Sequence, residues 1–217
     1  SYQWQKVVVG QPLLEKSKCM KKAWLIGFNV ATLLAWLCYF THALLHGLQF
    51  NEQILLFLAI AQGLAIFEIF NAVIGIAGAS WLLTTMQVFS RFLVVGLLFW
   101  IPAEKWIELG TYSTITGFML ISIAWSITEI VRALFYLTEI GKKPIKAITF
   151  SRYTFFIFLY PIGVLGEFLI MFAFWEYREF RFDVWNIILA TIALSYFVFF
   201  PKLYMHMWKQ RKKKLTA

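Results

Sequence analysis

Tyr160 and Glu167 are two residues whose chemical types and spacing suit proton transfer. Together with Tyr153 they recur every seven residues, and at about 100° per residue a helix places all three near one face. A phenol can donate a proton and a carboxylate can accept one, so the pair fits general acid–base catalysis. Tyr160 alone would also fit an ordinary aromatic of a helical bundle. Glu167 is harder to explain in that way, because the sequence around it is apolar.

Pro161, Gly163 and Gly166 lie between this tyrosine and this glutamate. A proline inside a helix removes a backbone hydrogen bond and favours a kink, and glycines leave little side-chain bulk beside the polar stripe. We therefore expect a kink near Pro161 and a place where a substrate can approach the backbone closely. Gly163 is a candidate substrate-binding position for that reason.

Other ionisable residues also lie inside apolar segments, where they are costly and usually face a helix-bundle interior or a wet cavity. Glu129 and Arg132 are spaced to pair on one helical face, as are Arg132 and Tyr136. Acids and bases balance in this set, so buried ion pairs that fix helix packing explain it as well as a substrate site does. The set is Glu68, Arg91, Glu129, Arg132, Arg152 and Glu167.

Metal and thiol chemistry are poorly supported. His42 and His46 are spaced like a metal-binding pair, but no third ligand accompanies them, and zinc needs three or four. Neither Cys19 nor Cys38 is followed by arginine at the spacing of a thiol phosphatase loop. No nucleotide-binding or Ser-His-Asp pattern occurs. Acid–base chemistry without a metal or redox cofactor remains, as in proton abstraction next to a carbonyl with loss or addition of water.

The elements that must hold these residues are membrane helices. The 217 residues are 61% hydrophobic and 14% charged, with a mean hydropathy of +0.72, which is outside the soluble globular range. An apolar run of about 18 residues or more is long enough to cross a bilayer. We expect an all-α, polytopic membrane bundle of six transmembrane helices in one domain over 1–217. The predicted spans are about 23–45, 53–76, 80–101, 112–137, 148–175 and 184–206.

The net charge of +9 indicates membrane topology rather than nucleic-acid binding. Basic residues gather before the first span, between the fourth and fifth, and after the sixth, whereas the alternate connections are neutral to acidic. The first group includes Lys6, Lys16, Lys18, Lys21 and Lys22; the second Lys142, Lys143 and Lys146; the third the segment 209–214. The positive-inside rule then predicts that both termini are cytosolic. The first span is expected to serve as the insertion signal, without cleavage.

Several segments carry a family resemblance. The segment 151–167, SRYTFFIFLYPIGVLGE, resembles the signature of the very-long-chain (3R)-3-hydroxyacyl-CoA dehydratases, also called protein-tyrosine-phosphatase-like A proteins. Matching segments occur in nearly every span: FNV at 28–30, EI at 68–69, IGI at 74–76, QVFSR at 87–91, AWSITEIVR at 124–132 and FPKLYMHM at 200–207. Two positions depart from it: Asn71 stands where animal members have histidine, and the end 213–217 is out of register for a dilysine retrieval signal.

The resemblance implies the third step of fatty-acid elongation, in which a 3-hydroxyacyl-CoA loses water to give the trans-2-enoyl-CoA. It also implies Tyr160 and Glu167 as the catalytic pair, no cofactor, and a location in the endoplasmic reticulum membrane. Glu167 would take the proton next to the thioester and Tyr160 would protonate the departing hydroxyl, although the reverse assignment stays open. The expected partners are membrane lipid and the elongase, ketoacyl reductase and enoyl reductase of the cycle.

The remaining candidates would bind the substrate. Lys142, Lys143 and Arg152 are positioned to attract a polyanionic CoA head from the cytosol. The other candidates, which would bind substrate or polarise the thioester, are Arg91, Arg132, Tyr136, Tyr153 and Gly163. Two other functions remain open: a non-catalytic membrane scaffold that binds elongase partners, and a small transporter using Glu68, Glu129 and Glu167 as a proton path. Neither scaffold nor transporter would form product from an acyl-CoA.

Overall fold

Helices make up the regular structure of the part of the chain that the computed structural model describes. It covers residues 2–76, 80–102, 114–181 and 183–215, with the backbone alone for 2–17 and 114–115. The helices are α1 (Tyr2–Leu45), α2 (Glu52–Gly63), α3 (Ile66–Val73), α4 (Trp81–Trp100), α6 (Thr114–Ile140), α7 (Lys146–Arg152), α8 (Phe156–Tyr177) and α9 (Val184–Leu215).

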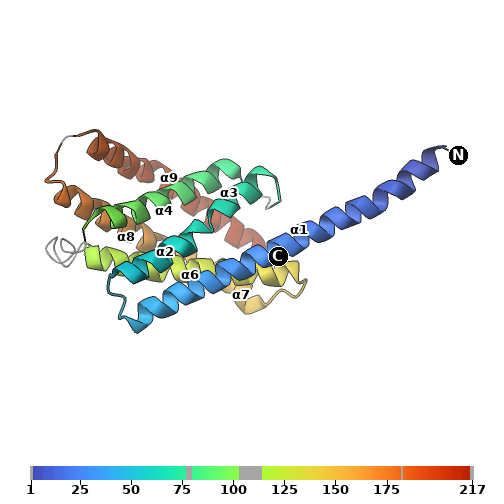
Figure 1. Cartoon of the computed structure of the whole chain (residues 1–217), viewed down its shortest axis with the longest axis horizontal. Helices are drawn as coiled ribbons and strands as arrows, with labels where there is room; N and C mark the ends of the chain where they lie inside the picture. Colours follow the sequence, from blue (N-terminus) through green and yellow to red (C-terminus); the bar gives the residue numbers. More distant parts are fainter. Residues whose placement is uncertain (1, 77–79, 103–113, 182, 216–217) are drawn as a thin grey trace.

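Six segments are long and apolar enough to cross a membrane, which confirms the predicted all-α polytopic bundle. They lie in α1, α2 with α3, α4, α6, α8 and α9. An even number of crossings places the chain ends on the same side, and Figure 1 shows both ends toward the same end of the bundle, with α1 continuing beyond it. The six segments are Lys18–Leu45, Glu52–Val73, Trp81–Trp100, Thr116–Ile140, Phe156–Tyr177 and Val184–Leu215.

Two predicted spans are not single helices. The second breaks between α2 and α3, directly after Gly63, the residue type that disfavours a helix interior most after proline. The fifth was predicted to run through 148–175, but α7 ends at Arg152 and α8 begins at Phe156. Tyr153 lies in the turn between them, so it does not share a helix with Tyr160 and Glu167. The polar residues Ser151, Arg152 and Thr154 stand at this turn and were a possible signal for it.

The last helix is longer than its predicted span. It continues past residue 206 to Leu215 and ends in a lysine-rich turn. Lysine favours helices, and its charge is stabilising near a helix C-terminus. The end of the chain from 216, part of the supposed retrieval signal, lies outside the described residues.

α6 is the centre of the bundle and packs against α1, α7 and α8. The closest approach is between α6 and α8, where Gly117 faces Gly166: a Cβ atom built on Gly166 would lie 2.9 Å from the Gly117 carbonyl oxygen and 2.8 Å from Ile121. Small residues at a membrane-helix interface permit such contact. We expected Gly166 to expose backbone to a substrate, and this was wrong, because α6 covers it.

Aromatic rings join α4, α8 and α9 where α4 ends and α9 begins. The Trp100 ring lies 5.9 Å from that of Trp185 and 6.4 Å from that of Phe174. The neighbouring connection between α8 and α9 is tied by an ion pair between Arg178 and Asp183. The connection between α4 and α6, with Glu104, Lys105 and Glu108, lies outside the described residues.

Candidate active site

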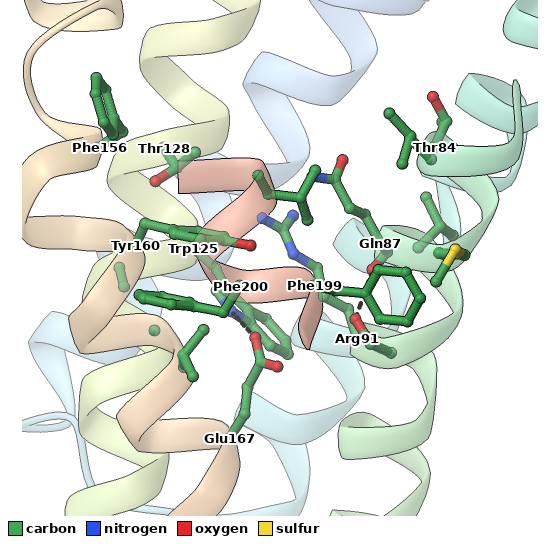
Figure 2. Close-up of a pocket in the computed structure, with 18 of the residues that line it drawn as sticks. Thr84, Gln87, Arg91, Trp125, Thr128, Phe156, Tyr160, Glu167, Phe199 and Phe200 are labelled. Carbon is green, nitrogen blue, oxygen red and sulfur yellow. Dashed lines mark hydrogen bonds between the residues drawn. The ribbon is translucent and has the colours of Figure 1, made fainter. Parts of the chain in front are cut away.

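A cavity of about 490 Å³ lies between α4, α6, α8 and α9 and extends to Arg152 at the end of α7. Tyr160 and Glu167 both line it, and Figure 2 shows their side chains pointing into the same space from α8. Other predicted candidates that line the cavity are Arg91, Arg132, Arg152 and Gly163. The cavity therefore gathers the predicted acid–base pair and three of the predicted cationic groups.

Glu167 is buried, with 6% of its surface exposed, and two neutral groups donate hydrogen bonds to its carboxylate. The indole N–H of Trp125, on α6, donates to Oε1 at 3.2 Å. The hydroxyl of Tyr196, on α9, donates to Oε2 at 2.5 Å. Each oxygen thus has one donor from a different helix, and the orientation of the carboxylate is fixed across the cavity wall. A carboxylate held only by neutral donors keeps its remaining lone pairs for a proton.

Tyr160 belongs to an aromatic stack between α8 and α9. Its ring lies 4.9 Å from the Phe200 ring at an interplanar angle of 2°, and 6.4 Å from the Tyr204 ring. Stacking fixes the plane of the phenol and leaves its hydroxyl at the rim of the stack. Among the described residues no hydrogen bond engages that hydroxyl, so it can donate to a ligand in the cavity.

α8 continues through Pro161 as one helix, although proline cannot donate to the carbonyl four residues earlier. That carbonyl belongs to Ile157, and the Tyr204 hydroxyl of α9 donates to it at 3.3 Å. A side chain of the neighbouring helix thus satisfies the acceptor that Pro161 leaves free. The same contact holds the aromatic stack beside Tyr160.

The charged wall of the cavity is an ion-pair network, as the packing interpretation of the sequence suggested. Arg91 Nη1 lies 2.5 Å from Glu129 Oε1, and Arg132 contacts both Glu129 and Glu68. Glu129 is 2% exposed, whereas both arginines keep part of their surface in the cavity. The Arg91 guanidinium also lies 5.4 Å from the centre of the Trp125 ring. Opposite charges balance across α3, α4 and α6, and the arginines also face a ligand.

Four predicted substrate-binding residues lie away from the cavity. The Tyr153 ring packs on Phe135, at 5.7 Å. Tyr136 also contacts Phe135 and is 41% exposed. Lys142 and Lys143 are exposed in the connection between α6 and α7. They lie at the same end of the bundle as Arg152. They could attract an anionic ligand toward the cavity, but they do not form part of its wall.

The sequence interpretation missed Tyr196 as a functional candidate and treated Trp125 only as part of a family motif. Tyr196 is one of several aromatics in an apolar span, so its type alone carried no signal. A possible signal was the spacing of Tyr196 along the helix. It belongs to a stripe of residues that recur at three- and four-residue intervals and all line the cavity, at positions 192, 196, 200, 203 and 207.

His42 and His46 contact each other, with ring centroids 4.5 Å apart, and the Phe57 ring packs on His42. Within the described ranges no cluster of three or more His, Cys, Asp or Glu residues could hold a metal ion. Both cysteines are exposed and free. The groups that line the cavity are instead the acid–base pair and the charged side chains described above.

Fold and site define a class of protein: a six-span helical membrane protein with a tyrosine and a buried glutamate facing one cavity beside an arginine–glutamate network. Residues 62–217 match the model of the family described as protein tyrosine phosphatase-like protein, PTPLA, and the chain belongs to this family.

Curated relatives align with most of the chain. It is 34% identical over 216 residues to the very-long-chain (3R)-3-hydroxyacyl-CoA dehydratase hpo-8 of Caenorhabditis elegans, covering 89% of this chain and 95% of the relative. It is 33% identical to the very-long-chain (3R)-3-hydroxyacyl-CoA dehydratase 2 of Mus musculus, covering 89% and 81%. A probable dehydratase of Schizosaccharomyces pombe is 32% identical, covering 91% and 95%. No solved structure matches the chain.

Proposed function

We propose that this protein dehydrates long-chain and very-long-chain (3R)-3-hydroxyacyl-CoA to the trans-2-enoyl-CoA, using Tyr160 and Glu167. The observation that carries the proposal is their joint position on one cavity wall, in a chain whose curated relatives are named for this reaction. The reaction is the third step of the elongation cycle, so an elongase and a ketoacyl reductase would supply the substrate and an enoyl reductase would consume the product. The expected location is the endoplasmic reticulum membrane, with both termini cytosolic.

The proposed step moves one proton to the enzyme and one from it. Glu167 takes a proton from C2 of the substrate, which the neighbouring thioester acidifies. The C2–H electron pair forms the C2–C3 double bond, the C3–O bond breaks, and the leaving oxygen takes the Tyr160 proton to give water. A proton on Glu167 and a phenolate at Tyr160 remain, and proton return from Glu167 to Tyr160 restores the starting state.

The surroundings of the two groups support this assignment of base and acid. Glu167 receives hydrogen bonds from Trp125 and Tyr196, which both act as donors to an ionised carboxylate. Donation from two fixed neutral groups orients the base without neutralising it through an ion pair. The phenol of Tyr160 is a neutral donor at pH 7. General acid–base catalysis of this kind contributes about 100- to 10,000-fold in rate.

Seven residues separate the pair, which is about 10 Å along an ideal helix axis. A substrate must therefore extend along α8 with C3 toward Tyr160 and C2 toward Glu167, and both side chains must reach toward it. Gly163 lies between them and lines the cavity, although the position of an added Cβ would be next to α6, at 3.5–3.7 Å from Ala124 and Trp125.

Positive charge would guide the head of the substrate. Arg152 lines the cavity at the end of α7, and the exposed Lys142 and Lys143 lie on the connection before it. Their charges suit the phosphates of CoA. Arg91 and Arg132 lie deeper, where a guanidinium can polarise the thioester carbonyl while it stays paired with Glu129.

The proposal is tested by turnover of the purified full-length protein with a (3R)-3-hydroxyacyl-CoA, measured as formation of the conjugated enoyl thioester. We expect turnover, and we expect it to persist in the presence of a metal chelator, because the proposed chemistry uses no metal. Binding of the acyl-CoA without product would favour the scaffold instead. Inactivation by chelators with recovery on adding zinc would contradict the site assignment.

A further inference from the structure

The walls of the cavity differ in polarity. Hydrogen-bonding and charged groups come from α6, α8 and the inner face of α4, where Glu129, Glu167 and Arg91 lie. The side formed by the first half of α4 and the second half of α9 is mostly apolar, although Thr84 and Gln87 of α4 also line it. Its apolar side chains are Leu83, Met86 and Phe89 of α4 and Phe199, Leu203 and Met207 of α9. A ligand with a polar reactive group and a hydrocarbon tail would find both surfaces in one cavity.

The described contacts between α4 and α9 lie at one end of the cavity and near its middle. Trp100 and Trp185 join α4 to α9 at the end opposite Arg152, with ring centroids 5.9 Å apart. Nearer the middle, Ser90 of α4 lies within hydrogen-bonding reach of Tyr196 of α9. Within the described chain, no hydrogen bond or ring contact joins residues 81–89 to 199–207. The packing of α9 is mainly on α8. Residues of both helices line the cavity beyond Ser90, so α4 and α9 flank a cleft there, on the side of Arg152.

Side chains at this cleft are both part of the cavity wall and exposed on the outside of the bundle. Phe89 is 62% exposed, Leu83 is 39% exposed and Phe199 is 36% exposed, yet all three line the cavity. Figure 2 shows Phe199 among the side chains that line the site. The cavity is open to the surface rather than fully enclosed, and an exposed fraction as high as that of Phe89 fits a position at this opening. For a membrane-spanning bundle, the surface at this depth faces hydrocarbon.

The volume of the cavity limits what it can enclose. A pocket of about 300–1,000 Å³ holds a drug-sized ligand, and this cavity of about 490 Å³ is in the lower half of that range. It can hold the thioester, C2, C3 and the first part of the chain. A whole very-long acyl chain needs a further path.

We propose that the acyl chain of the substrate leaves the cavity sideways through the cleft between α4 and α9, defined by Leu83, Met86, Phe89, Phe199, Leu203 and Met207, and lies in the bilayer. The inference rests on the proposed function and specifies where its substrate binds. An apolar chain loses nothing by passing from an apolar cleft into lipid. The enzyme would then accept long acyl chains, because no closed tunnel would limit their length.

Narrowing the cleft tests this path. Leu203→Trp and Met86→Trp add bulk at its two walls, away from Tyr160 and Glu167. Leu194→Trp is the matched control, because Leu194 is on the same helix as Leu203, is 66% exposed and does not line the cavity. We expect the two cleft variants to lower kcat/KM for a very-long-chain substrate about tenfold, the scale of an overpacked contact. The kcat/KM for 3-hydroxybutyryl-CoA, whose chain fits the cavity, should fall by a much smaller factor, so that the preference for the very-long-chain substrate drops in the cleft variants and not in Leu194→Trp.

A cross-linking measurement covers the case in which a tryptophan disturbs folding. A photoreactive amino acid is placed at Phe89 or at Leu194 in the full-length protein, which is then illuminated with a radiolabelled very-long-chain 3-hydroxyacyl-CoA. We expect labelling of the protein at position 89 and little at 194. Equal labelling at both positions, or none at 89, would overturn the proposal, because the tail would then lie randomly in detergent or along another path.

The two proposals fail in different ways. If the unmodified protein dehydrates neither the very-long-chain substrate nor 3-hydroxybutyryl-CoA, the proposed function is wrong. If that substrate turns over and the very-long-chain substrate is equally well used by Leu203→Trp, Met86→Trp and Leu194→Trp, the function stands and the lateral path is wrong.

Discussion

Two buried carboxylates of this protein differ in what surrounds them. Glu129 contacts the guanidinium groups of Arg91 and Arg132, so its negative charge is balanced by ion pairs within the protein. Glu167 has hydrogen bonds from Trp125 and Tyr196 and no ion pair among the described residues. A charge already paired is a poor base, whereas an oriented and unpaired carboxylate is available to a substrate. This contrast separates a packing role for Glu129 from a chemical role for Glu167.

Tyr196 is expected to position the base. Tyr196→Phe removes the donor to Oε2 of Glu167 and keeps the ring. A hydrogen bond to a charged group contributes about 1.5–3 kcal/mol, so we expect kcat to fall about 10- to 100-fold, with KM for the acyl-CoA little changed. With a substrate deuterated at C2, the kinetic isotope effect should rise, since proton abstraction becomes slower than the other steps.

Tyr204→Phe is the matched control for Tyr196→Phe. Tyr204 is also a tyrosine of α9, but its hydroxyl donates to the Ile157 carbonyl rather than to Glu167. We expect at most a loss of thermal stability and no change in the isotope effect. The positioning role would be refuted if the two variants gave the same kinetic pattern, or if Tyr196→Phe kept full kcat.

At the level of single residues, the sequence predicted which side chains lie together where both belong to one helix, because their spacing then decides whether they share a face. Tyr160 and Glu167 are on one helix, and their separation by two turns predicted a shared face. Tyr196 reaches Glu167 from another helix, and the stripe of α9 on which it lies does not indicate that this face meets Glu167. Arg132 shows both cases: its pairing with Glu129 at three residues was expected, whereas its contact with Glu68, 64 positions away, is tertiary.

The element that decides the geometry of the site is the α6–α8 pair. Its close contact needs glycine at Gly166, because an added Cβ would lie 2.8 Å from Ile121 and 2.9 Å from the Gly117 carbonyl oxygen. Trp125 and Glu167 are on the same two helices. The distance between helix axes therefore sets the hydrogen bond that orients the carboxylate.

Gly166→Ala should push α6 and α8 apart. Overpacking of a tight interface costs about 1–3 kcal/mol, so we expect a lower melting temperature in detergent and reduced turnover. Gly163→Ala is the control on the same helix, since its Cβ would meet Ala124 and Trp125 at ordinary contact distances of 3.5–3.7 Å. Its melting temperature should be unchanged. Equal effects of the two substitutions on melting would show that the close approach at Gly166 is not needed.

Hydropathy predicted six spans because each crossing requires a long apolar run, and all six are present. It did not predict the turn at Leu64–Ala65, since apolar residues continue through it, and it missed the turn at Tyr153–Phe155 although polar residues stand at 151, 152 and 154. Such breaks depend on packing and on backbone hydrogen bonds that composition does not encode. As a result Tyr153 was placed on the catalytic stripe, although it lies in a turn and packs on Phe135.

For the molecule as a whole, the distribution of charge predicts its orientation. The lysine-rich end of α9 and the connection with Lys142 and Lys143 should be cytosolic, together with the N-terminus. Glycosylation acceptor sites inserted in the connection 178–183 should be modified in microsomes, and sites at either terminus should not. Modification at a terminus would show that the protein has the opposite orientation. In that orientation the CoA head could not reach Arg152 from the cytosol.

The central claim, that Tyr160 and Glu167 perform the dehydration, is tested most directly by measuring turnover and melting temperature of Tyr160→Phe and Glu167→Gln in the same detergent preparation. We predict that each loses about 100- to 10,000-fold in rate while melting and acyl-CoA binding stay close to the unmodified protein. Glu129→Gln is the control for a structural carboxylate, and breaking its buried pairs should cost about 3–5 kcal/mol of stability. Near-normal turnover in Tyr160→Phe or Glu167→Gln, or activity lost only in proportion to folded protein, would contradict the account.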